Sequence, residues 1–422
     1  MRTVLVTGPG GAGRTTVAAA TALAAARRGG SALLLTPDPI PGFPRDTGPT
    51  EVAAGLWAAR IDSAEHFRDE FLALQDRASG VLDLLGGARL DGEEITELPG
   101  STQLALLHSL RRAAEGDWSR RGHDLLVVDL PPLGEALDLL SLPARLRRYL
   151  RRLLPPERQA ARALRPMLAQ LAGVPMPAQW LYEAAARKDA ELAAVQALIE
   201  DAGTTLRLVA EPGPAAEEAL RAARTGLALH GLRVDTLAVN RLLPRHSADP
   251  WFAALAAQQE KTVDRWRDEW APHAALRELP HLGRDPRGLD DLDRLAEHTA
   301  PAPDHGVPGP GRAEDPWWIE VPDAPEGLGA LLPGSRIVRT APDGDGDGVP
   351  VLVWCLPLPG AVKKDLRLVR RGDELLLTVG PYHRTVPLES GLRRCTVSGA
   401  SLTDGLLRVR FTPDPDLWPR TG

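Results

Sequence analysis

The fold of this 422-residue chain is decided by the stretch Gly8-Pro9-Gly10-Gly11-Ala12-Gly13-Arg14-Thr15-Thr16. It follows an apolar run at residues 3–7 and precedes an alanine-rich run at residues 17–24, so a strand, a glycine-rich loop and a helix come in that order. The pattern G-x-x-x-x-G-K-[ST] of a phosphate-binding loop fits at the right spacing, with Arg14 in the place of the lysine. The alternative is a glycine-rich turn before a helix, and the flanking strand and helix favour the phosphate-binding loop.

In such a loop, main-chain N–H groups approach phosphate oxygens closely, and Cβ atoms would obstruct that approach. The helix N-terminus adds its partial positive charge. Thr15 occupies the position of the hydroxyl that binds Mg²⁺. Arg14 keeps the positive charge on a planar fork rather than a compact ammonium, so we expect phosphate binding without efficient hydrolysis. The residues predicted to contact the nucleotide here are Gly8, Gly10, Gly11, Ala12, Gly13, Arg14, Thr15 and Thr16.

The composition limits the classes of protein that fit. A chain of 422 residues with 43% apolar content is long enough for two domains with substantial cores. Its net charge of -6 gives no argument for a nucleic-acid partner. Cys355 and Cys395 stand forty residues apart, which excludes a disulfide framework and a Cys-x-x-Cys zinc clamp. No signal segment or membrane-length apolar run is found, so we expect a soluble cytoplasmic protein without an integral membrane segment.

Two further apolar runs end in carboxylates. Residues 31–36 predict a second strand that closes a parallel βαβ unit and leads to Asp38. Residues 124–129 predict a buried strand ending in Asp129, which is the place of the carboxylate that reaches Mg²⁺ in P-loop proteins. Gly134 follows and can offer its N–H to a γ-phosphate. Because ligands bind at the carboxyl ends of parallel strands, both aspartates are expected near the phosphates; for Asp38, an Asp-Pro turn is the alternative.

The remainder of the first three hundred residues continues the α/β pattern. Strands are predicted at 206–210 and 235–240 around a helix at 215–230, and a last strand at 276–280 precedes a helix near 288–298. Asn240 ends a strand on the ligand side, where an amide can both donate to and accept from an adenine edge. Residues 50–120 are predicted to be mostly helical.

Residues 142–154 predict a basic amphipathic helix. Such a helix can touch acidic lipid or nucleic acid. A helix packed by its leucines with a solvated basic face is the interpretation we favour, because no aromatic residues are interleaved for base stacking.

The composition changes near residue 300. Residues 300–315 are rich in Pro and Gly, as in a linker. Beyond them, short apolar runs at 352–356, 366–369, 374–379, 384–388 and 405–411 are separated by Pro, Gly and Asp turns and predict a small β-sandwich. The run Asp343–Gly348 matches the opening of a calcium loop, but Trp354 stands where the bidentate glutamate is required, so a flexible acidic loop is preferred.

These motifs resemble those of the ArsA family of deviant-Walker P-loop ATPases, which drive arsenite pumps or target tail-anchored proteins. The family's loop G-K-G-G-V-G-K-T-T matches residues 8–16, its switch I S-T-D-P-A matches 36–40, and its switch II D-T-A-P-T-G matches 129–134. Its L-x-L-L-x-L-P run matches 137–143, and its adenine-contacting V-N falls on 239–240. Residues 351–412 resemble the small heat-shock (α-crystallin-like) domain appended to many bacterial relatives.

The resemblance implies roles for particular residues. Asp38 would orient the attacking water, Thr15 and Asp129 would hold Mg²⁺, and Asn240 and Pro280 would join the loop in binding the nucleotide. ATP and Mg²⁺ are the implied cofactors. The implied partners are a second ArsA-like subunit, in a homodimer or heterodimer, and a client protein; no nucleic acid is expected.

Several departures from the family pattern bear on mechanism. Pro9 replaces the signature lysine that reaches the partner's phosphates, and Arg14 takes the catalytic cation's place in the loop. Leu130 and Leu133 replace the switch II hydroxyls. Loss of groups that stabilise the transferring phosphoryl costs on the order of 10² to 10³ in rate per donor. Neither zinc-clamped dimerisation nor metalloid transport is supported, because the cysteines for them are missing.

The sequence thus predicts an α/β protein with three parts. Residues 1–300 form a doubly wound, mostly parallel P-loop domain with a helical subdomain within about 45–120 and 140–205. Residues 301–316 form a linker, and residues 317–422 form an all-β sandwich. Two functions fit: weak Mg²⁺-dependent ATP hydrolysis that drives dimer closure and client handling, or a catalytically silent nucleotide-binding or chaperone-like subunit that partners an active paralogue.

Overall fold

The computed structural model describes residues 1–77, 79, 87–115, 117–119, 122–154, 178–299, 313–322, 332, 336–340 and 351–418. The chain divides into two compact units: unit 1 is Met1–Gly213 with Val234–Arg312, and unit 2 is Pro214–Arg233 with Ala313–Gly422. Most of the predicted linker and the whole Asp343–Gly348 loop lie outside the described residues.

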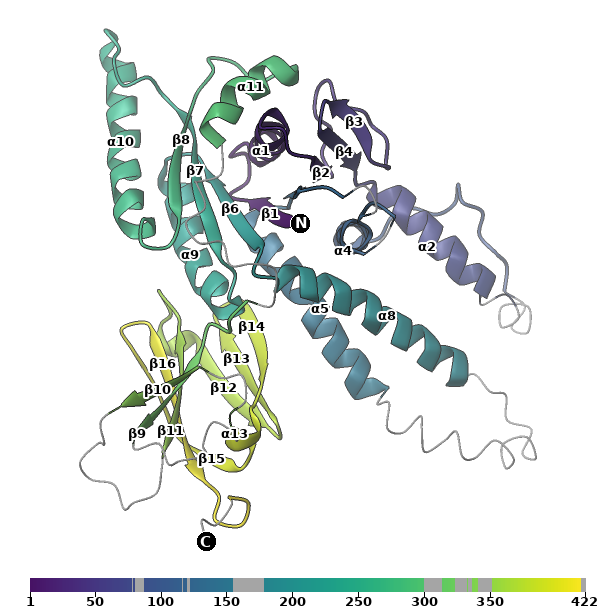
Figure 1. Cartoon of the computed structure of the whole chain (residues 1–422), viewed down its shortest axis with the longest axis vertical. Helices are drawn as coiled ribbons and strands as arrows, with labels where there is room; N and C mark the ends of the chain where they lie inside the picture. Colours follow the sequence, from purple (N-terminus) through teal and green to yellow (C-terminus); the bar gives the residue numbers. More distant parts are fainter. Residues whose placement is uncertain are drawn as a thin grey trace. The chain divides into compact units, whose positions relative to one another are not determined.

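Unit 1 is built on an eight-stranded sheet in the order β3-β4-β2-β5-β1-β6-β7-β8 (Figure 1). Every neighbouring pair is parallel except β3 with β4. The inner strands β1, β2, β5 and β6 are almost entirely buried, as expected for parallel strands covered on both faces. The predicted α/β fold is confirmed. The strands are β1 Arg2–Thr7, β2 Ala32–Thr36, β3 Thr50–Ala53, β4 Leu56–Arg60, β5 Leu125–Asp129, β6 Thr204–Ala210, β7 Val234–Leu242 and β8 Ala275–Pro280.

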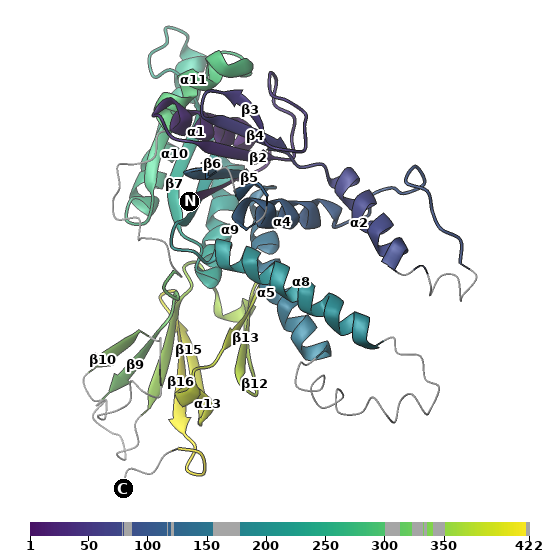
Figure 2. The same ribbon diagram turned by 45° about the vertical axis from the view of Figure 1, so that its right-hand side comes forward.

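The helices of unit 1 pack on this sheet or on one another. Helix α1 (Arg14–Arg27) buries a face of alanines with Val17 and Leu23, and these short side chains let it pack closely on the strands. Helices α5 and α8 run side by side in Figures 1 and 2, joined by the ion pair of Arg147 with Asp189 at 3.0 Å. The other helices are α2 Ser63–Arg77, α4 Ser101–Ala114, α5 Leu133–Leu153, α8 Ala178–Ile199, α10 Pro250–Trp270 and α11 Gly288–Thr299.

The prediction that residues 50–120 are mostly helical is wrong at its start. Residues 50–60 form the hairpin β3–β4, which turns at Gly55 with a φ of 76°. Strand β4 extends the sheet by pairing in parallel with β2, and most of its side chains are buried. In an apolar run as short as 56–60, hydrophobic periodicity cannot distinguish a strand from a helix. The pairing with β2 is what makes this run a strand.

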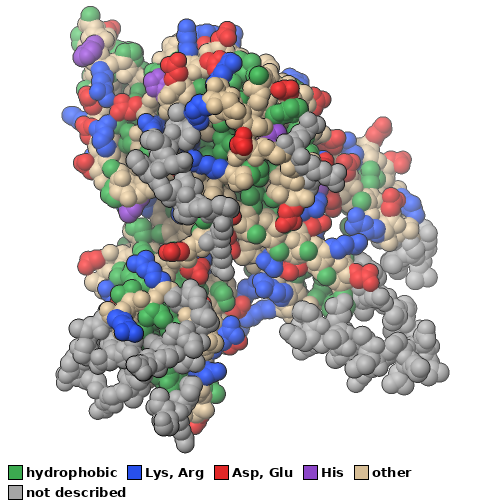
Figure 3. Space-filling view, viewed as in Figure 1, with side chains coloured by type: hydrophobic (Ala, Val, Ile, Leu, Met, Phe, Trp, Pro, Cys, Tyr) green, Lys and Arg blue, Asp and Glu red, His purple; other side chains and the backbone are tan. Residues whose placement is uncertain are grey.

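The predicted basic helix at 142–154 is the second half of α5, which continues through Pro143. Its arginines are partly used in pairing: Arg147 binds Asp189 and Gln196 of α8, and Arg145 binds Asp138 at 3.0 Å. On the face shown in Figure 3, basic and acidic side chains of the described residues are interspersed. Among the described helices, none combines the length and hydropathy needed to cross a membrane.

Unit 2 contains two mostly antiparallel sheets, with the strand orders β10-β9-β11-β16-β15 and β12-β13-β14. Its core lies between them and includes Trp354, Leu377 and Phe411. The strands β9, β10 and β15 are not predicted by the sequence pattern. Most residues of β15 are exposed, so it lacks the apolar alternation that marks a half-buried strand. The strands are β9 Trp318–Pro322, β10 Ile337–Thr340, β11 Leu352–Pro357, β12 Leu366–Arg371, β13 Glu374–Val379, β14 Tyr382–Pro387, β15 Cys395–Thr403 and β16 Leu406–Pro413.

Helix α9 (Pro214–His230) connects β6 to β7 in sequence, yet it belongs to unit 2. Its Leu229 is fully buried in the core of that unit. The Thr225 hydroxyl donates to the carbonyl of Pro359 at 2.7 Å, and a Cβ at Gly226 would lie 2.7 Å from the ring of Tyr382. The packing of unit 2 therefore depends on a helix whose two ends are joined covalently to strands of unit 1.

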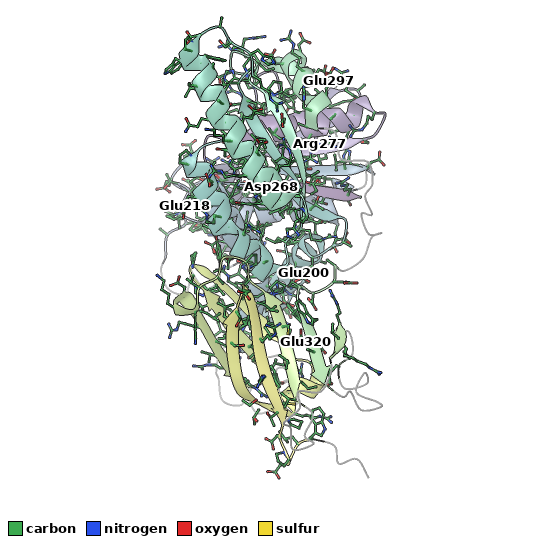
Figure 4. The ribbon with its side chains drawn as sticks, turned by 90° about the vertical axis from the view of Figure 1, so that its left-hand side faces the viewer. Glu200, Glu218, Asp268, Arg277, Glu297 and Glu320 are labelled. Carbon is green, nitrogen blue, oxygen red and sulfur yellow. The ribbon has the colours of Figure 1, made fainter. Side chains whose placement is uncertain are left out.

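Leu229→Ala is expected to lower the free energy of unfolding of unit 2 by about 2–5 kcal/mol, because it removes a fully buried side chain and leaves a cavity. Denaturant-dependent hydrogen exchange of peptides from β13, in the full chain, measures this. Glu218→Ala, at a mostly exposed position on the same helix (Figure 4), should change it by no more than about 0.5 kcal/mol. Equal effects of the two variants would show that α9 is not part of this core.

Candidate functional site

The site forms where the strands of unit 1 end. Because β2, β5, β1, β6 and β7 are neighbours and parallel, their carboxyl ends share one edge of the sheet. The glycine-rich loop leaves β1 at this edge, Asp38 follows β2, Asp129 ends β5, and Asn240 lies near the end of β7. The predicted site residues from four separate segments are thereby brought to one edge.

The loop requires glycine at specific points. Gly11 and Gly13 have φ angles of 75° and 87°, in the left-handed region that disfavours other residues. A Cβ at Gly8 would lie 1.9 Å from the carbonyl oxygen of Val209, so no side chain fits there. Among the described residues, no atom lies within 4 Å of a Cβ built at Gly10, so the loop is open on that side. The backbone of the loop is accessible to a ligand.

Helix α1 begins at the end of this loop without a side-chain cap and without an acidic residue in its first turn. The N–H groups of a helix's first turn have no partner within the helix, and they carry partial positive charge. An uncapped helix N-terminus beside an open glycine loop offers N–H donors and partial positive charge to an anion.

Two hydroxyl–carboxylate pairs lie beside the start of α1. The Thr15 hydroxyl donates to Asp38 Oδ2 at 3.3 Å, and the Thr36 hydroxyl donates to Asp129 Oδ2 at 3.0 Å. Asp129 is 1% exposed, and its Oδ1 has no hydrogen-bond partner among the described residues. Burial raises the pKa of Asp129 to about 6, against the opposing effects of the nearby Thr15 and Thr36 hydroxyls and the charge of Arg14. A buried carboxylate oxygen without a partner, next to a threonine hydroxyl, fits a hard cation such as Mg²⁺.

Arg14 joins the start of α1 to the segment after β5. Its Nη1 donates to the carbonyl of Leu130. The same segment is held from the β1 side, since the Thr7 hydroxyl donates to the Pro131 carbonyl at 2.8 Å and the Leu133 N–H donates to the Gly8 carbonyl at 3.0 Å. The guanidinium is thus bonded to switch II in this structure.

Two cavities adjoin the loop. One, of about 200 Å³, is lined by Thr15, Thr16 and Asp38 together with residues from 39–41 and 286–292. The other, of about 40 Å³, is lined by Gly13, Thr16, Asn240, Arg241, Pro280, His281, Leu282, Arg284, Asp285, Pro286 and Leu295. The predicted Asn240 and Pro280 therefore lie in one cavity with the loop. Gly134, in the first turn of α5, lines neither of them.

Sequence reasoning missed some residues of this site. Thr36, which binds Asp129, has a local signal: a hydroxyl at the carboxyl end of a strand, beside the carboxylate of a neighbouring strand. Arg241 has a φ of 57°, a backbone conformation that no local pattern indicates. The loop at 282–287 lines the smaller cavity, and nothing in its composition marks it.

The parallel sheet, the glycine loop at the start of α1 and the aspartate at the end of β5 define a P-loop nucleotide-binding protein. Residues 1–300 match the family model described as anion-transporting ATPase, and residues 351–411 match the HSP20-like domain found in ArsA proteins. The chain belongs to the ArsA anion-transporting ATPase family.

Three relatives match along most or all of the chain, and one of them has the name of an arsenical pump-driving ATPase. An uncharacterized protein of Streptomyces coelicolor is 54% identical over 100% of both chains. A protein of Mycobacterium tuberculosis is 30% identical over 78% of this chain and 71% of its own. A protein of Aquifex aeolicus provisionally named arsenical pump-driving ATPase 1 is 24% identical over 93% of this chain and 95% of its own.

Asp129→Asn is expected to change how stability depends on pH in the ligand-free chain. The pKa of Asp129 is about 6 in the folded protein against an ordinary 3.8, so between these pH values only the folded chain holds the proton. The contribution of Asp129 to the free energy of unfolding is therefore lost as pH rises from about 4 to about 6. At pH 8 the variant should be more stable by roughly 2–3 kcal/mol, and near pH 4 the difference should vanish. Denaturant titrations between pH 4 and pH 8 measure the free energy of unfolding of both chains. If the two chains showed the same dependence on pH, the raised pKa of Asp129 would be contradicted.

Proposed function

We propose that the chain binds Mg·ATP at the loop and hydrolyses it slowly. The observation that carries the proposal is the open, uncapped start of α1 beside the buried, unpartnered oxygen of Asp129. In this proposal the N–H groups of residues 10–16 hold the phosphates, and Thr15 and Asp129 hold Mg²⁺. The nucleoside lies toward the cavity of Asn240 and Pro280.

The chain's own residues supply the remaining chemistry. Bound Mg²⁺ would neutralise charge on the phosphates. Asp38, which lies beside Thr15 at the edge of the larger cavity, is proposed to orient the attacking water. Arg14 would have to break its hydrogen bond to the Leu130 carbonyl to reach the phosphates. Its planar guanidinium also differs in shape from a lysine ammonium. We propose that both features make hydrolysis slow.

Switch II offers a route from the nucleotide to the helices. Helix α5 begins at Leu133, three residues after Leu130, and packs along α8. Release of Leu130 by Arg14 would therefore act at the start of a helix that leads away from the site. We propose that this movement drives closure of a dimer with an ArsA-like subunit and the handling of a client protein by the helical region.

Calorimetric titration of the full chain with ATP, with Mg²⁺ and with a chelator, tests the proposal. The native chain should bind one ATP, more tightly with Mg²⁺. Asp129→Asn should remain folded and lose the gain from Mg²⁺, because an amide is a weaker ligand of a hard cation than a carboxylate. Absence of Mg·ATP binding by the native chain would overturn the proposal.

A second function is favoured by two observations: Pro9 stands in the place of a lysine, and Arg14 is bonded to Leu130. Both fit a nucleotide-binding subunit that does not hydrolyse ATP and pairs with an active paralogue. Phosphate release by the native chain alone separates the two. Turnover that is lost in Asp38→Asn supports the slow ATPase, whereas ATP binding without turnover supports the silent subunit.

A further inference from the structure

The side chain of Asn240 is bonded to the phosphate-binding loop itself. Its Nδ2 donates to the carbonyl of Ala12 at 2.8 Å, and the residue is 6% exposed. A Cβ built at Gly13 would lie 2.4 Å from the same Nδ2. The amide therefore occupies the space that any side chain at position 13 would need, so the loop and Asn240 fit together as one structure.

An irregularity in β7 aims this side chain. The pairing of β7 with β8 shifts register after Val239, and Arg241 has a φ of 57°. Gln259 of α10 holds the distorted segment: its Oε1 accepts from the Leu243 N–H at 2.9 Å, and its Nε2 donates to the Arg241 carbonyl at 3.4 Å. Bulges of this kind re-aim side chains next to functional sites, and strained backbone persists where surrounding contacts hold it.

We propose that Asn240 is a positioning residue for the loop, one that supports triphosphate binding whatever base is attached. The inference rests on the proposed function of the loop as a phosphate site. A loop that binds phosphate must present N–H groups inward and keep carbonyl oxygens turned away, since a carbonyl facing a phosphate would repel it. The bond from Asn240 holds the Ala12 carbonyl in one orientation. Without this bond, the loop samples conformations that cannot bind phosphate. The affinity then falls in proportion to the fraction of molecules whose loop is competent to bind.

Two probes separate positioning from base recognition: Mg·ATP and inorganic magnesium tripolyphosphate, which has no base. Asn240→Asp replaces the donor by an acceptor facing the Ala12 carbonyl and should weaken both probes by about tenfold. Gln258→Glu is the matched control, because it also replaces an amide by a carboxylate, but at an exposed position of α10 that lines neither cavity. It should leave tripolyphosphate binding unchanged. Loss of ATP affinity alone in Asn240→Asp would overturn the inference and favour adenine recognition.

Hydrogen exchange of the ligand-free chain provides a readout that needs no nucleotide. Peptides that cover residues 8–16 should exchange about tenfold faster in Asn240→Asp, while peptides from β5 and α11 stay at the native rate. Gln258→Glu should leave all of them unchanged. Unchanged exchange of the loop in Asn240→Asp would refute the positioning role, even if the native chain bound no nucleotide. If the native chain bound neither probe but the loop exchanged faster in Asn240→Asp than in the native chain, only the phosphate-site proposal would be refuted.

Discussion

Arg14→Lys is expected to raise the rate of ATP hydrolysis by about 10²-fold over the native chain. A lysine ammonium at this position reaches the β- and γ-phosphates in P-loop proteins. The native guanidinium instead donates to the Leu130 carbonyl, and its planar fork does not match the place of a compact ammonium. Phosphate release at saturating Mg·ATP measures the rate.

Arg14→Gln is the matched control, since it keeps much of the side chain's length and loses the charge. It should bind Mg·ATP more weakly and gain no rate. A different result would require another account of slow hydrolysis: if Arg14→Lys turned over more slowly than the native chain at equal affinity, the guanidinium itself would be the cation that stabilises the transition state.

Asp235→Ala is expected to lower the free energy of unfolding of unit 1 by about 3–5 kcal/mol. Its partner Arg207 is 1% exposed and lies inside unit 1. Arg207 Nη2 binds Asp235 at 3.0 Å, while Nη1 donates to the Thr21 hydroxyl at 3.0 Å and the Thr299 carbonyl at 2.9 Å. Removal of the carboxylate would leave a buried guanidinium without its counter-charge. Denaturant-dependent hydrogen exchange of β6 peptides measures the loss.

The surface pair of Arg27 with Asp293 provides the control for this prediction. It also joins an arginine to an aspartate of unit 1, at 2.5 Å, but its side chains are 54% and 35% exposed. Asp293→Ala should therefore cost less than about 1 kcal/mol. A double variant, Arg207→Met with Asp235→Leu, should recover most of the stability lost in Asp235→Ala, because no fully buried charge is left without a partner. Arg2, which also binds Asp235 at 3.3 Å, is 24% exposed and keeps access to solvent. If Asp235→Ala lowered the free energy of unfolding no more than Asp293→Ala does, the buried pair would contribute no more to stability than the surface pair.

The central strands of unit 1 can be predicted from sequence because they are buried on both faces. Strands β1, β2 and β5 appear as uninterrupted apolar runs, and each is followed by its glycine loop or carboxylate. The apolar run of β4 is too short to distinguish a strand from a helix, and β3 and the exposed strand β15 have no such run. Strand β4 is fixed by its pairing with β2, and β15 by its pairing with β16, and local patterns do not encode such pairing.

For the candidate site, the sequence predicts which strand ends carry functional groups but not how those groups are used. The bond of Arg14 to Leu130 spans 116 residues, and that of Asn240 to Ala12 spans 228. The raised pKa of Asp129 follows from burial, which only the folded sheet produces. The membership of α9 in unit 2 cannot be predicted from the sequence either, because the apolar face of this helix is equally consistent with packing on either unit.

A crystal structure of the full chain with Mg²⁺ and a non-hydrolysable ATP analogue would test the central claim most directly. We predict phosphates against the N–H groups of residues 10–16, a cation between the Thr15 hydroxyl and Asp129, and the Arg14 guanidinium moved from the Leu130 carbonyl to the phosphates. A loop without nucleotide at saturating concentration, with Arg14 still bonded to Leu130, would contradict the claim that this loop captures a triphosphate.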